Sequence, residues 1–160
     1  MSNDPNSLFR AATELRDQDR LPEAKDTLVA CLKVIGEGEY GLMSAAYSQL
    51  AHIEDTLADR APDQDTRIEH LARVADYAAR AVKANGVAEL PSLQLFIVLS
   101  ELGRLKEAYE EAIRYLSLRA SAEYQSMLGQ RHAEERDPEI AELANTVRRL
   151  LASPPGDHAE

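Results

Sequence analysis

The side chains in this sequence that could bind a metal ion or transfer a proton are its four histidines, and their spacing argues against both roles. They are His52, His70, His132 and His158. None belongs to an HExxH pair or to a CxxC cluster, and no two of them are one helical turn apart. Glu54 and Asp55 follow His52 closely, but neighbouring residues of a helix point in different directions. We therefore expect no metal site and no cofactor.

The sequence gives no better support for a catalytic nucleophile. The single cysteine, Cys31, lies among Leu28, Val29 and Leu32, where a small buried hydrophobic residue is the simplest interpretation. Neither a GxSxG turn nor a glycine-rich phosphate-binding loop occurs in the chain. The sequence therefore predicts a protein that is not an enzyme and that has no disulfide within the chain.

The charge of the chain disfavours two classes of partner. Eighteen basic and twenty-eight acidic side chains give a formal net charge of -10, which repels nucleic acid and anionic lipid surfaces. The opening MSNDPNSLFR has no basic and apolar leader, and no apolar run is long enough to span a bilayer. We expect a cytoplasmic protein that binds neither nucleic acid nor membranes. Acidic stretches such as EAYEEA are most simply solvated helix faces, although a basic partner would be attracted by their field.

Proline, glycine and asparagine divide the sequence into segments that each have the periodicity of an amphipathic helix. About eight helices are expected, at 5–17, 22–35, 43–57, 68–82, 91–102, 105–118, 122–135 and 137–152. We expect a single all-α domain over residues 1–152. Its helix pairs lie at about 5–35, 40–85, 91–118 and 122–152, and a disordered tail follows at 153–160.

A recurring pair of residues, separated by twelve positions, indicates that these helices form repeated hairpins. The pairs are Ala12 and Ala24, Phe96 and Ala108, and Gly129 and Ala141. The stretches LQLFIVLSELGRLKEAYEEAIRYLSL and LFRAATELRDQDRLPEAKDTLVACLKV resemble the tetratricopeptide repeat (TPR) family. The sequence departs from the family pattern where Asp19 replaces the turn glycine and where Tyr115 occupies a position that is usually small. The proline that commonly follows the second helix is also missing.

The resemblance implies antiparallel helix hairpins stacked as a short right-handed solenoid, with a concave face formed by the first helix of each pair. An irregular helical bundle is the alternative architecture. Carried over unit by unit, the positions facing a bound partner are Phe9, Thr13, Arg16, Ser44, Ser48, His52, Leu93, Ile97, Ser100, Ser126 and Gln130. Phe9, Leu93 and Ile97 could equally belong to the core. The lysines and asparagines with which some members of the family clamp a peptide carboxylate are absent from these positions.

The family resemblance and the missing catalytic groups together predict an adaptor that binds an apolar or basic segment of another protein on its concave face. A chaperone-like or toxin-neutralising role would fit an acidic helical protein. The alternative is a self-associating structural module, a homodimer formed through apolar helix faces such as the run LFIVL at 95–99 or through an uncovered final helix pair. A third hypothesis is a metal protein that uses His52, His132 and neighbouring carboxylates.

Overall fold

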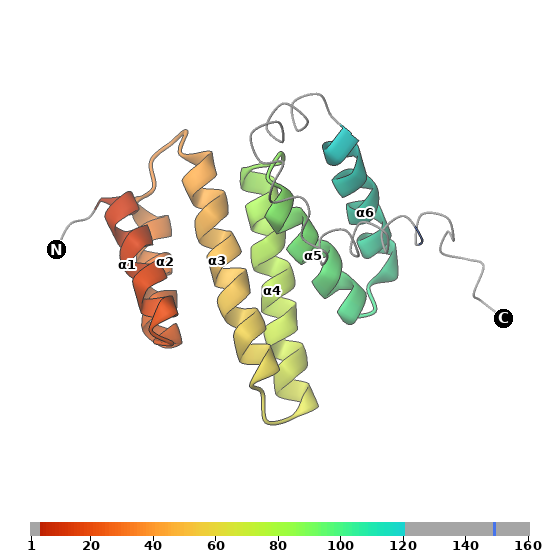
Figure 1. Ribbon diagram of the computed structural model, residues 1–160, viewed down its shortest axis with the longest axis horizontal. Helices are drawn as coiled ribbons and strands as arrows, with labels where there is room; N and C mark the ends of the chain where they lie inside the picture. The colour runs from red at the N-terminus through yellow and green to blue at the C-terminus, as the bar shows by residue number, and fades with distance from the viewer. Residues whose placement is uncertain (1–3, 121–148, 150–160) are drawn as a thin grey trace, which may run out of the picture.

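The computed structural model describes residues 4–120 and residue 149, and this part of the chain is built from helices (Figure 1). It contains six α-helices, α1 Pro5–Asp17, α2 Leu21–Val34, α3 Tyr40–Asp59, α4 Gln64–Ala84, α5 Glu89–Glu101 and α6 Leu105–Ala120. Six helices are therefore present in the described residues, rather than about eight. The seventh and eighth helices expected at 122–135 and 137–152, and the tail at 153–160, lie outside the described residues.

The starts of α1 and α6 match the prediction, whereas α2, α3, α4 and α5 begin one to four residues earlier than expected. The Asp4 carboxylate accepts a hydrogen bond of 2.8 Å from the Ser7 amide, and Pro5 follows in the first turn of α1. At α4 the capping residue is Asp63, which accepts from the Thr66 amide at 2.8 Å. This cap starts α4 at Gln64, four residues before the predicted start, because a side-chain acceptor for the first amides outweighs the polar character of the segment.

The turn at Asp19 explains one departure from the family pattern. Asp19 has φ 60°, and Gly103 has φ 70° in the equivalent turn between α5 and α6. Aspartate is among the few residues other than glycine that tolerate this left-handed conformation. The Asp19 carboxylate also forms an ion pair of 2.8 Å with Arg60, which follows α3. The substitution therefore keeps the turn and adds a link to the second helix pair.

The six helices form three antiparallel pairs, α1 with α2, α3 with α4 and α5 with α6, which stand side by side (Figure 1). The first helices contact one another along the stack, α1 with α3 and α3 with α5. The second helices do not, since no Cα atom of α4 lies within 8 Å of α2 or of the described α6. The stack is therefore tighter on the side of α1, α3 and α5. We call this side the inner face.

Two clusters of buried side chains fill the stack. The first lies between α1, α2 and α3 and includes Ala12, Ala24 and Leu28, all fully buried. The second lies between α3, α4, α5 and α6, and it includes Phe96 and Tyr115. Tyr115 is fully buried because the neighbouring helices leave room for its ring, and its hydroxyl donates to Glu89 Oε1 at 2.9 Å. Ala12 and Ala24, the small residues of the repeat pattern, lie where helices approach closely.

A buried carboxylate joins the first two helix pairs. The side chain of Glu54 on α3 is fully buried. It accepts hydrogen bonds from Lys25 on α2 and, at 2.7 Å, from the Nδ1 atom of His70 on α4. Burial by itself would raise the pKa of Glu54, but the bonds from Lys25 and His70 lower it below its ordinary value. Glu54 is therefore ionised in the folded protein and links three helices.

Replacing this carboxylate by an amide is expected to destabilise the fold. Glu54→Gln keeps the shape of the side chain but removes the charge, so it should lower the free energy of unfolding by about 2 kcal/mol. Urea denaturation monitored by circular dichroism measures the change. The matched control is Glu69→Gln on the exposed side of α4, which should change stability by less than about 0.5 kcal/mol. Equal effects of the two substitutions would contradict this role of Glu54.

The same carboxylate should make stability depend on pH. Because the pKa of Glu54 is lower in the folded chain than its ordinary 4.5, the unfolded state takes up the proton first as the pH falls. The stabilisation is therefore complete above the ordinary pKa and is lost as the pH falls through the folded value. Denaturation curves at neutral and acidic pH should show the difference between wild type and Glu54→Gln shrinking with acidification. A difference that stays constant would contradict the assignment.

Candidate partner-binding surface

The residues predicted to face a partner lie on α1, α3 and α5, the helices of the inner face, wherever the structure describes them. Ser126 and Gln130 lie outside the described residues. Contact of these residues with a partner stays a prediction. The side chains themselves divide into those that hold the helices together and those that remain accessible.

Several predicted hydroxyl groups make internal hydrogen bonds. Ser44 is buried and donates to the Ala81 carbonyl on α4 at 2.9 Å. Ser48 is also buried and donates to Gln94 Oε1 on α5 at 2.7 Å. These two groups join α3 to its neighbours and present little surface to a partner. The proposed surface therefore leaves out Ser44 and Ser48.

Thr13 and Ser100 are partly buried, and their hydroxyl groups also make internal hydrogen bonds. The Thr13 hydroxyl donates to the Phe9 carbonyl at 3.0 Å and accepts from Gln49 Nε2 on α3 at 2.8 Å. The Ser100 hydroxyl donates to the Phe96 carbonyl of its own helix at 2.9 Å. Thr13 thus bonds across the gap between α1 and α3, while Ser100 satisfies only the backbone one turn earlier.

The predicted apolar residues lie at different depths. Leu93 is 9% exposed and belongs to the second core cluster. Phe9 is partly buried against the first cluster. Ile97 packs against the second cluster but remains partly accessible on α5. Of the three, Leu93 therefore has the clearest core role, and Ile97 is the one that lines a hollow of the inner face.

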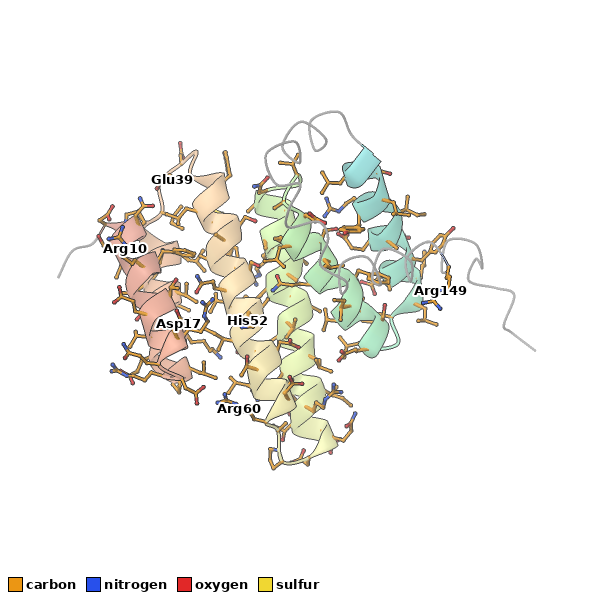
Figure 2. The ribbon with its side chains drawn as sticks, in the orientation of Figure 1. Arg10, Asp17, Glu39, His52, Arg60 and Arg149 are labelled. Carbon is orange, nitrogen blue, oxygen red and sulfur yellow. The ribbon has the colours of Figure 1, made fainter. Side chains whose placement is uncertain are left out.

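Two polar positions stay accessible. His52 is exposed, and the labelled view places it partway along α3 (Figure 2). Arg16 is partly exposed and donates to the carboxylate of its neighbour Asp17 at 2.8 Å. Both side chains can contact a partner without disturbing a bond between helices.

A recess opens between α3 and α5 on the inner face. Its lining is mostly apolar, with carboxylate and amide groups among the apolar side chains. The lining residues are Ala51, Asp55, Val74, Gln94, Ile97, Val98 and Glu101. Gln94 is fixed by its bonds to Ser48, whose hydroxyl donates to it and whose carbonyl accepts from it at 3.4 Å. The recess therefore has a shape set by bonds between α3 and α5.

The recess is electrically negative. Loss of hydration raises the pKa of Asp55, and the nearby carboxylates of Asp59 and Glu101 raise it further, against weaker opposing effects of His52 and Arg67. Arg67 pairs with Glu101 at 3.1 Å. One arginine thus neutralises part of the charge of three carboxylates.

The sequence pattern missed Asp55, Gln94 and Glu101, although it carried a signal for two of them. Asp55 is three residues after His52, and Glu101 is four residues after Ile97, so both continue a face that had already been selected. Extending each helix face by one turn would have reached them. Gln94 has no such signal, because its place depends on the Ser48 hydroxyl of another helix.

Neither a group of candidate metal ligands nor a membrane-spanning helix occurs among the described residues. No three histidine, cysteine or acidic side chains in residues 4–120 are grouped so that they could hold a metal ion. None of the described helices combines the length and hydrophobicity required to cross a bilayer.

The bond from Ser48 to Gln94 gives a test of whether this hydroxyl is structural. Ser48→Ala should lower the free energy of unfolding by about 1 to 2 kcal/mol, because it leaves a part-buried amide oxygen without its donor. Ser100→Ala is the matched control, since it removes a hydroxyl bonded only within its own helix. Urea denaturation should show little change for the control. If both variants are as stable as wild type, Ser48 does not hold α3 to α5.

No protein-family model and no curated protein sequence matches this chain. Its three-dimensional structure is similar to the C-terminal TPR-containing domain of a Plasmodium falciparum protein described as an FK506-binding protein. The TM-score is 0.61 at 12% sequence identity, and the match covers 93% of this chain and 89% of that one. The resemblance to tetratricopeptide repeats is thereby confirmed at the level of the fold, which is an all-α stack of antiparallel, TPR-like helix pairs.

Proposed function

We propose that this chain is a non-catalytic interaction module that holds a segment of another protein against its inner face. The observation that carries the proposal is the recess between α3 and α5, which is open, mostly apolar and bordered by carboxylates. TPR-like stacks in general serve as protein-binding modules. The accessible residues of the proposed surface are His52, Asp55, Ile97 and Glu101, with Arg16 at the α1 end.

The chemistry of this surface favours a partner with apolar and basic side chains. Burial of apolar area on Ile97 and its neighbours supplies affinity, and the negative field of a chain with net charge -10 steers basic segments toward it. A chaperone-like or toxin-neutralising role requires the same property, which is the masking of a basic or apolar segment. We place both roles within this proposal.

Self-association through the apolar run of α5 is a weaker alternative. Leu95, Phe96, Val98 and Leu99 are each less than 9% exposed, so this run is used within the chain's own core. A homodimer would need another surface. The final helix pair, the other surface considered for it, lies outside the described residues.

Site-specific photo-crosslinking tests which face binds a partner. A photoreactive phenylalanine analogue replaces His52 on the inner face or, as a matched control, Asp26 on α2, which is also exposed. In a native lysate, the variant at position 52 should form a crosslink to a distinct polypeptide, and the variant at position 26 should not. Both positions are exposed, so neither replacement should disturb the core.

The outcome decides between the proposed function and its alternative. A crosslink from position 52 to a second copy of the chain would favour the homodimer. Crosslinking from position 26 alone, or no specific crosslink from position 52, would contradict binding on the inner face.

A further inference from the structure

We propose that the recess between α3 and α5 receives one lysine or arginine side chain of the bound segment. This inference rests on the proposed function and names the chemistry of the residue that its central site accepts. The aliphatic stem of the partner side chain lies against Ala51, Ile97 and Val98, and its cationic group lies between Asp55 and Glu101.

The lining of the recess suits a long side chain with an apolar stem and a charged end. Its lining combines four apolar residues from three helices with one amide and two carboxylates. Lysine and arginine commonly bury their methylene groups along an apolar surface while the charged group stays near water or a carboxylate. A purely apolar side chain would bring no charge to Asp55 and Glu101, and an acidic one would be repelled by them.

The charges around the recess are incompletely balanced within the chain. Asp55 is repelled by both Asp59 and Glu101, while the arginine that acts on it, Arg67, is paired with Glu101. His52 is the other titratable neighbour of Asp55. A cation from a partner therefore relieves a repulsion that is already present in the unbound protein.

The ionised side chain of Asp55 lowers the stability of the free protein. Its pKa is raised above the ordinary 3.8 in the folded chain, so the folded state holds the proton more tightly than the unfolded state does. The fold is therefore favoured by Asp55 only at acidic pH, and at neutral pH the ionised carboxylate opposes folding. A residue that costs stability in the free protein is typical of a functional site.

The test uses a matched pair of synthetic peptides and nuclear magnetic resonance of the whole chain. One probe is acetyl-Gly-Leu-Lys-Leu-Gly-amide, and the other has norleucine in place of lysine, which keeps the stem and removes the charge. The lysine peptide should shift the Ile97 methyl and Asp55 carboxyl resonances saturably and lower the pKa of Asp55. The norleucine peptide should bind at least about tenfold more weakly than the lysine peptide.

A charge-matched pair of variants gives the second arm. Asp55→Asn should weaken binding of the lysine peptide by about tenfold. Asp26→Asn, which makes the same charge change on α2, should leave this binding unchanged. Asp55→Asn should unfold at a urea concentration equal to or above that of wild type at pH 7, so a loss of binding would not be due to unfolding.

The two proposals fail in different ways. The cation site is overturned if the lysine peptide shifts neither resonance. It is also overturned if the norleucine peptide binds as tightly as the lysine peptide, or if the Asp55→Asn protein binds the lysine peptide as tightly as wild type does. A specific crosslink from position 52 to a different protein would then still support the proposed function. Absence of that crosslink overturns the proposed function itself.

Discussion

The ion-paired carboxylate of Glu54 is the interaction on which the arrangement of the stack depends most. A charge without access to water is tolerated in a protein interior only where donors compensate for the lost hydration, and here Lys25 and His70 do so from two other helices. All three helices must therefore keep one relative position. Among the other described helices, only α3 has Cα atoms within 8 Å of α1 or α2, and the bond from Lys25 to Glu54 is one of the links between α3 and the first pair.

Hydrogen bonds between the first helices then set the width of the inner face. Thr13 receives the amide of Gln49 between α1 and α3, and Ser48 and Gln94 bond to each other between α3 and α5. Short hydroxyl side chains allow these helices to approach, as they do where α1, α3 and α5 contact along the stack. These polar side chains hold neighbouring helices together and present little surface to a partner, and the recess lies beside them.

The carboxylates of the chain differ in how completely nearby cationic groups compensate their charge. Asp19 pairs with Arg60 at a turn, and Glu54 is compensated in the interior. Around Asp55 the compensation is incomplete, because Arg67 is shared with Glu101. This contrast distinguishes carboxylates that stabilise the fold from those that remain available for contact with another molecule.

The sequence by itself determined the helical class, the pairing of the described helices and, to within two residues, most of their ends, because proline, capping aspartates and turn residues act through the few residues beside them. It also selected the helices of the inner face, since the Ala12 and Ala24 spacing fixes the register of a hairpin. Tertiary structure decided which side chains on those helices are accessible. The Ser48 hydroxyl turns inward because Gln94 of another helix accepts its hydrogen, and Asp55 becomes part of a recess because Glu101 lies opposite it. Such partners are distant in sequence, so no local pattern records them.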